Sequence, residues 1–355
     1  MSRKNVIAQG SFGCILKSIQ CQNTKKGRNR VVKMQLTEYA KRELTQYRFL
    51  YHRIPTAKLF LLELPVPCRP KRTMKNRRSI KQCNYNNINS DYDSDDEDDN
   101  NNNIDKYSFI VMQNGGKNLI DFVSAARLTT RGKLKNLYED LEPLLHGLHK
   151  IYQIGWMHHD VKPQNILYDL RQRKAALIDL GHMVSFSAMV IDILDHELYE
   201  DAFPHWSYPP EFGNFYGFEN FKQNSALNLN EYNIMLTKYI FRGNGVIAGK
   251  YKSNELQFFA SALQERQPLT RAKYAEFVEK SVSTFDLFGF GCALGKIASV
   301  TLHKSKYSPP MFNLALQLLT PNVYGRLTFE ETIRAYRLIL EEQNPFSPSS
   351  SSRTK

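Results

Sequence analysis

The first third of the chain alternates short apolar runs with polar intervals. Apolar pairs occur at Val6 with Ile7, at Ile15 with Leu16 and at Val31 with Val32. Residues 107–112 form a further apolar run after a long polar interval. Short apolar runs bounded by turn residues are typical of β-strands, so this part is predicted to be a small, strand-rich piece.

The pattern becomes helical beyond residue 130. Apolar residues spaced by three and four predict an amphipathic helix that faces a core, and they are Leu137, Leu141, Leu144, Leu145, Leu148 and Ile151. Pro143 lies among them, and an interior proline kinks or starts a helix, so we expect this helix to begin near Glu142. A strand-rich piece followed by a larger helical piece predicts an α+β protein.

Residues 69–105 differ in composition from the sequence on either side. Residues 69–81 are basic, and residues 90–103 are acidic and rich in asparagine. Such sequence has little to bury, so we predict a disordered insertion over 69–105, and a disordered tail over 344–355. The basic run is open to three interpretations: a nuclear-import signal, a nucleic-acid patch, or a partner for the acidic run. Ser94 is a predicted target for an acid-directed kinase.

Composition excludes two classes of protein. Among the 355 residues, 42% are hydrophobic and 12% aromatic, which is too apolar for a disordered chain. No stretch of 18 apolar residues occurs, and residues 1–10 lack the apolar core of a signal peptide, so a membrane protein is not expected. We therefore predict an intracellular protein, cytoplasmic or nuclear. Lys and Arg exceed Asp and Glu by 48 to 35, a net charge of +13, which favours acidic partners; nucleic acid is not expected as the main one.

The cysteines predict neither a metal site nor a disulfide framework. They are odd in number and scattered without a Cys-x-x-Cys pair: Cys14, Cys21, Cys68, Cys83 and Cys292. We expect reduced, inert thiols.

Two features of the strand-rich piece suggest phosphate chemistry. Gly10 and Gly13 bracket a turn whose backbone amides could approach phosphate oxygens, although the same pattern is common in ordinary hairpins. Lys33 stands on an apolar strand, where its ammonium group needs a partner or a ligand. Glu43 is the expected partner because it borders the apolar stripe of the following helix, and Glu38 is the competing candidate.

The most specific pattern lies between residues 158 and 179. Asp160 is a candidate general base, and Lys162 can neutralise a phosphoryl group. Asn165 and Asp179, fourteen residues apart, carry the hard oxygen atoms that magnesium prefers. Together these residues resemble the catalytic loop and the metal-binding aspartate of the protein-kinase family, His-Arg-Asp-x-x-x-x-Asn and Asp-Phe-Gly.

That resemblance extends in order from about Val6 to about Leu340. It implies that ATP and Mg²⁺ are the cofactors, that Asp160 and Lys162 are catalytic, and that Asn165 and Asp179 hold the metal. Residues 208–211 resemble the end of the activation segment, Asp286 matches the helix that supports the catalytic loop, and Arg326 falls where an arginine pairs with Glu211. The implied nucleotide-binding residues are Ala8, Gly10, Gly13, Ile15, Val31, Lys33, Glu43, Met112, Gln113 and Asn114.

The implied architecture is the bilobal, protein-kinase-like α+β fold. Its small β-rich lobe would cover residues 1–113, and its larger helical lobe residues 114–343, with a long insertion over 213–283. Lys162 favours transfer to Ser or Thr over Tyr, so the resemblance implies an ATP-dependent Ser/Thr kinase acting on protein substrates. Neither the identity of those substrates nor the oligomeric state follows from the sequence.

Three residues depart from the family pattern. Ala8 replaces the first glycine of the phosphate loop, His159 replaces the arginine before Asp160, and Leu180 replaces the phenylalanine after Asp179. Loss of that arginine implies less need for a phosphorylated activation segment. Divergence of this kind with the catalytic residues retained resembles the kinases of large DNA viruses.

Two alternative functions stay open. A pseudokinase that serves as a binding scaffold would explain Ala8 and His159, but it would usually have lost one of the catalytic residues that are present here. A small-molecule phosphotransferase would share the Asp-x-x-x-x-Asn loop, but it would generally lack the features at Glu211, Asp286 and Arg326.

Overall fold

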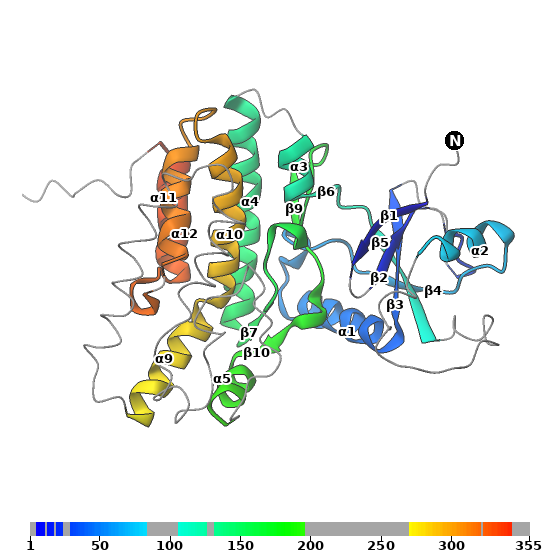
Figure 1. The fold of residues 1–355 in the computed structure, drawn as a ribbon, viewed down its shortest axis with the longest axis horizontal. Coiled ribbons are helices and arrows are strands. Elements are labelled where there is room, and N and C mark those ends of the chain that lie inside the picture. The colour runs from blue at the N-terminus through cyan, green and yellow to red at the C-terminus, as the bar shows by residue number, and fades with distance from the viewer. Residues whose placement is uncertain are drawn as a thin grey trace, which may run out of the picture. The chain divides into compact units, whose positions relative to one another are not determined.

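A computed structural model gives the fold in two compact units (Figure 1). One unit comprises Met1–Gly115 with Asp179–Gly181, and the other comprises Gly116–Ile178 with His182–Lys355. Each unit has its own hydrophobic core. The residues that the structure describes are 5–10, 13–17, 19–23, 29–83, 106–125, 131–195, 270–320 and 322–342.

A five-stranded antiparallel sheet is the centre of the first unit. Its order is β1-β2-β3-β5-β4, and its strands are β1 (Val6–Gly10), β2 (Gly13–Leu16), β3 (Arg30–Leu36), β4 (Val66–Cys68) and β5 (Tyr107–Gln113). The predicted strands are therefore confirmed. The register places Lys33 on β3 between Ile15 of β2 and Ile110 of β5.

The glycine at position 13 has a structural reason. Gly13 opens β2 opposite Gln35, and a Cβ atom there would overlap the carbonyl oxygen of Met34. Only glycine lets the two strands approach this closely. Ser11 and Phe12, between β1 and β2, lie outside the described residues.

Helix α1 (Thr37–Arg53) follows β3 directly. Its buried side chains recur at helical spacing, and they are Ala40, Glu43, Leu44, Tyr47 and Leu50. The carboxylate of Glu43 is thus the single charged group on an otherwise apolar face, whereas Glu38 is exposed. A short 3₁₀ turn, η1 (Ala57–Leu59), leads from α1 toward β4.

Two disulfides correct the expectation of reduced thiols. Cys14 pairs with Cys83, Cys21 pairs with Cys68, and all four lie in the core cluster of the first unit. The pairs join residues 69 and 47 positions apart, so linear spacing gave no sign of them. Cys292 of the second unit keeps its thiol, and burial raises the pKa of that thiol.

The basic run is ordered, which corrects the predicted start of the disordered insertion. Residues 74–81 form helix α2 (Met74–Lys81), capped by the Thr73 side chain, which accepts a hydrogen bond from Asn76 N. Pro70 forms an isolated β-bridge with Cys21. The sequence prediction failed because the order comes from covalent and hydrogen-bonded links to residues far away in the chain. The remainder of the predicted insertion, residues 84–105 with Ser94, lies outside the described residues.

The second unit is mainly helical. The helices in its described part are α3 (Leu119–Ala125), α4 (Arg131–Gln153), α5 (Phe186–Asp195), α9 (Arg271–Ser283), α10 (Phe285–Thr301), α11 (Ser308–Leu318) and α12 (Phe329–Leu340). The 3₁₀ turns are η4 (Pro163–Asn165), η5 (Leu180–His182), which begins within the first unit, and η8 (Val323–Gly325). The described residues also form two small antiparallel sheets. One comprises β6 (Lys117–Asn118), β8 (Ile166–Asp169) and β9 (Lys174–Leu177), and the other pairs β7 (Trp156–Met157) with β10 (Val184–Ser185).

Helix α4 runs through Pro143, so the predicted start near Glu142 is wrong. An interior proline costs about 3 kcal/mol. Each fully buried leucine contributes roughly 1.5–3 kcal/mol, and burial of the whole apolar stripe outweighs one lost hydrogen bond. The completely or almost completely buried side chains of α4 are Leu134, Leu137, Tyr138, Leu141, Leu144, Leu145, Leu148 and Ile151.

Helix α10 is the most deeply buried element of the second unit. Fourteen of its seventeen residues are buried, including Asp286 at its first turn. It packs along α11, which also contacts α12 (Figure 1). A helix that is apolar all round belongs inside a protein. In the described ranges, no helix is both long and apolar enough to cross a membrane.

Candidate functional site

The first group of predicted site residues surrounds the ammonium group of Lys33. Lys33 Nζ lies 2.7 Å from Glu43 Oε2 and 3.2 Å from Asp179 Oδ1. All three residues belong to the first unit, which takes in Asp179–Gly181 as a separate segment. The predicted pairing of Lys33 with Glu43 rather than Glu38 is confirmed, and Asp179 is a second partner that the residue pattern alone did not pair with it.

The charge balance keeps Lys33 protonated. Burial by itself would lower the pKa of Lys33, but the carboxylates of Glu43 and Asp179 more than compensate and raise the pKa above its ordinary value. The Lys33 side chain is 12% exposed and that of Asp179 is 24% exposed, so the pair is not sealed from solvent. The arrangement is a fixed cation with two anionic neighbours, one of them partly accessible.

Gln35 is a site residue that the sequence analysis missed. Its side chain is buried, and Nε2 donates a 2.8 Å hydrogen bond to Glu43 Oε2, the oxygen that also contacts Lys33. Gln35 follows Lys33 by two positions on β3, so both side chains lie on the same face of the strand. The available signal was a polar residue two positions after Lys33, on the same face of the predicted strand.

The second group of predicted residues centres on Asp160, in the second unit. Asp160 Oδ2 lies 2.7 Å from Lys162 Nζ and accepts a 2.7 Å hydrogen bond from Asn165 Nδ2. The same amide nitrogen donates to the Asp160 backbone carbonyl at 3.0 Å. Asp160 Oδ1 is buried and has no hydrogen-bond partner among the described residues. One carboxylate oxygen is therefore held by two side chains, and the other is a buried acceptor with no partner among the described residues.

Asp286 fixes the backbone that precedes Asp160. Its carboxylate accepts hydrogen bonds from the backbone N–H of His158 at 2.7 Å and of His159 at 3.0 Å. His159 has a φ of 66°, in the left-handed region that side chains seldom adopt. Burial raises the pKa of Asp286 to about 6, although the two backbone hydrogen bonds oppose this shift. Helix α10 thus holds a strained turn immediately before Asp160.

The helix approaches this loop through a glycine. A Cβ atom on Gly289 would overlap the carbonyl oxygen of Val161, one residue after Asp160. His158 adds a further link, because its Nε2 lies 3.0 Å from the carbonyl oxygen of Ile178. Ile178 in turn donates its backbone N–H to the Asn165 carbonyl at 2.9 Å. The residues around Asp160 are consequently fixed on several sides.

The other predicted nucleotide-binding residues all lie in the first unit. Ala8 pairs with Ile15 across β1 and β2, Val31 pairs with Met112 across β3 and β5, and Gly10 pairs with Gly13. Gln113 ends β5, and the backbone N–H of the following Asn114 donates to Asn29 at 3.0 Å. The register thus places Ile15 beside Lys33, and the pair of Val31 and Met112 lies two positions earlier along β3.

Part of the predicted pattern lies outside the described residues, including Glu211, residues 213–269 and residues 344–355. Residues 271–283 of the predicted long insertion form α9. Arg326, the predicted partner of Glu211, is buried; its Nε donates to the Thr320 carbonyl at 2.8 Å and its guanidinium lies over the ring of Phe288 at 5.1 Å.

The donor atoms suit a hard cation. Asn165 donates through Nδ2, so its Oδ1 is the amide oxygen that could bind a metal ion. Asp179 supplies a carboxylate that is partly exposed. No cluster of three His, Cys, Asp or Glu side chains suited to a metal occurs in the described part of the chain. The second unit therefore offers the amide oxygen of Asn165 to a metal ion, and the first unit offers the carboxylate of Asp179.

Comparison with known proteins gives one partial likeness. No protein-family model matches the chain. Over 53 residues, the chain is 42% identical to the "Probable serine/threonine-protein kinase fnkB" of Dictyostelium discoideum. The match covers 15% of this chain and 10% of that protein's length. It supports a relationship to protein kinases and gives no support to the viral resemblance.

Proposed function

We propose that the protein is an ATP-dependent Ser/Thr protein kinase. The observation that carries the proposal is the Lys33 ammonium group held by Glu43 at 2.7 Å and by Asp179, 146 positions away in the sequence, at 3.2 Å. Phosphoryl transfer requires positioning and charge compensation more than covalent catalysis, and this group supplies a fixed cation for nucleotide phosphates. The partial likeness to a probable Ser/Thr kinase points the same way.

Each residue then has a role set by its charge. Lys33 binds the α- and β-phosphates, and Glu43 keeps the ammonium group oriented. Asp160 accepts the proton of the substrate hydroxyl. At the same time the oxygen of that hydroxyl forms a bond to the γ-phosphorus of ATP, and the bond from the γ-phosphorus to the oxygen of the leaving ADP breaks. Lys162, 2.7 Å from Asp160, offsets the negative charge of the moving phosphoryl group. Asn165 and Asp179 would each offer an oxygen ligand to Mg²⁺, whose charge would offset that of the nucleotide phosphates.

The held geometry of Asp160 favours catalysis over a scaffold role. One Asp160 carboxylate oxygen is fixed by Lys162 and Asn165, and the other is a buried acceptor with no partner among the described residues, an arrangement that supports a role as proton acceptor. Keeping a buried polar atom unsatisfied costs about 1–3 kcal/mol, which a catalytic function would justify.

Transfer of labelled γ-phosphate from ATP tests the proposal. The full chain is incubated with Mg²⁺, ATP and generic acidic and basic proteins, beside Asp160→Asn and a matched control, Asp169→Asn. Asp169 also lies in the second unit, where it caps the turn at Arg171 and Gln172. We expect transfer to Ser or Thr by the wild type and the control, and none by Asp160→Asn.

Two results would contradict this. Binding of ATP without transfer by the wild type would favour the pseudokinase. Absence of ATP binding, measured by calorimetry, would overturn the nucleotide role of Lys33 altogether.

A further inference from the structure

The segment around α2 gives the first unit a surface on which all charged side chains are basic. No Asp or Glu occurs between residues 64 and 83. In the described part of the chain, none of its exposed basic side chains forms an ion pair with a carboxylate. We name this the α2 surface, and its exposed basic residues are Arg69, Lys71, Arg72, Lys75, Arg77 and Arg78.

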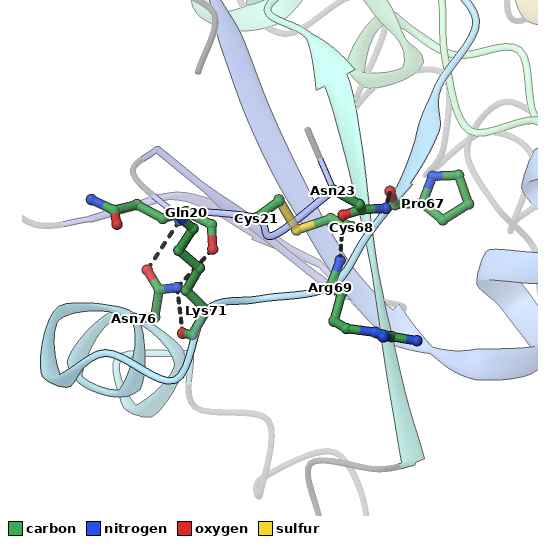
Figure 2. The surroundings of a disulfide bond; sticks show 8 residues. All are labelled: Gln20, Cys21, Asn23, Pro67, Cys68, Arg69, Lys71 and Asn76. Carbon is green, nitrogen blue, oxygen red and sulfur yellow. Dashed lines mark hydrogen bonds between the residues drawn. A yellow bond between two sulfur atoms is a disulfide. The ribbon is translucent and has the colours of Figure 1, made fainter. Parts of the chain in front are cut away.

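The backbone under the α2 surface is fixed at several points (Figure 2). The buried Asn76 side chain donates to the carbonyls of Gln20 at 2.9 Å and Lys71 at 2.8 Å, and accepts from Gln20 N at 3.1 Å. The Cys21–Cys68 disulfide precedes the segment, and Cys83 ties its end to Cys14. The charges are therefore carried on an ordered scaffold and not on a tail.

Among the described residues of the first unit, this arrangement is unfavourable. Like charges on neighbouring residues repel one another, and Lys75 lies in the first helical turn, where the helix dipole favours an acidic residue. A polyanion would relieve both effects.

The rest of the surface distinguishes between two kinds of polyanion. Protein interfaces have a core enriched in aromatic residues, Met and Arg and depleted of Lys, and their strongest anchors are Trp, Tyr and Arg. Residues 64–83 contain no aromatic residue, and the most exposed large apolar side chain is Met74, at 65%. A nucleic-acid backbone, in contrast, is bound by cations alone through the release of counterions.

We propose that the α2 surface binds the phosphate backbone of a nucleic acid without reading its base sequence. The absence of an aromatic residue leaves no platform on which unpaired bases could stack. Contacts to phosphates position a protein on a duplex and carry no sequence information. This surface is separate from the proposed kinase activity and does not depend on it.

Fluorescence anisotropy with a labelled 20-base-pair duplex, between 50 and 200 mM salt and without reductant, tests the proposal. The variant carries Lys75→Ala, Arg77→Ala and Arg78→Ala. The matched control loses the same charge through Lys41→Ala, Lys304→Ala and Arg334→Ala, all exposed residues elsewhere. We expect the first variant to lose at least about tenfold in affinity, and its log–log salt slope to become shallower by about 2–3, since each lost phosphate contact removes about 0.9. The control should keep both.

Three outcomes would overturn the proposal. The first is that the wild type fails to bind the duplex at 50 mM salt. The second is that the control variant loses as much affinity as the α2 variant, because the loss would then be due to net charge and not to the α2 surface. Preferential binding of a polyglutamate peptide that displaces the duplex would assign the surface to an acidic protein. Circular dichroism on both variants checks that each is folded.

Discussion

Gln35 is predicted to control nucleotide binding through Glu43, without touching the nucleotide. Its Nε2 donates a 2.8 Å hydrogen bond to the same Glu43 oxygen that contacts Lys33. Gln35→Met keeps the length of the side chain and removes the donor. Glu43 then loses one of the two groups that hold Oε2, and its carboxylate can rotate away from Lys33.

The size of the effect follows from the kind of bond that is lost. A hydrogen bond to a charged group contributes about 1.5–3 kcal/mol. If half or more of this is transmitted to the position of Lys33, the affinity for Mg-ATP falls roughly tenfold, since 1.4 kcal/mol corresponds to a factor of ten. We expect a dissociation constant about ten times larger, measured by isothermal titration calorimetry.

A double-mutant cycle separates this role from simple destabilisation. Glu43→Gln alone should weaken ATP binding, and adding Gln35→Met to it should cost little more, because the bond is already impaired. Val32→Ala is the control: Val32 is buried on the opposite face of β3, so its truncation should lower stability by about 1–3 kcal/mol and leave ATP affinity unchanged. Additive effects of Gln35→Met and Glu43→Gln, or unchanged ATP binding by Gln35→Met, would refute the reasoning.

Three further predictions concern stability. The pKa of Asp286 in the folded state is raised to about 6, so the native state binds more protons than the unfolded state between about pH 4 and 6. The free energy of unfolding should therefore fall by up to about 3 kcal/mol as the pH rises through this window. Urea titrations at each pH should show that Asp286→Asn removes this pH dependence. Gly289→Ala should destabilise the second unit by several kcal/mol, because the new Cβ would overlap the carbonyl oxygen of Val161. Gly181→Ala is the control: the space around Gly181 is open, so this variant should melt like the wild type in thermal scans. Equal melting temperatures of Gly289→Ala and the wild type would contradict the packing described. Reduction of the disulfides Cys14–Cys83 and Cys21–Cys68 should lower the free energy of unfolding by about 2–4 kcal/mol per bond, and unchanged denaturant midpoints with and without reductant would show that they do not form in solution.

The sequence by itself determined the local elements and the chemical groups. Apolar runs gave β1, β2, β3 and β5, because a strand shows its pattern within a few residues. Lys33 needed an anionic partner wherever it was buried, and helical phase was enough to choose Glu43 over Glu38. The spacing of Asp160, Lys162 and Asn165 predicted a compact group, since residues this close in sequence can only lie close in space.

The tertiary structure alone decided what depends on distant residues. The contact between Lys33 and Asp179 spans 146 positions, and the disulfides span 69 and 47. Helix α4 continues through Pro143 because burial of its apolar stripe outweighs the local cost of proline. The basic run is ordered because Asn76 bonds to Gln20 and because the flanking residues Cys68 and Cys83 are joined by disulfides to Cys21 and Cys14. In each case the deciding energy comes from contacts between segments that no local pattern brings together.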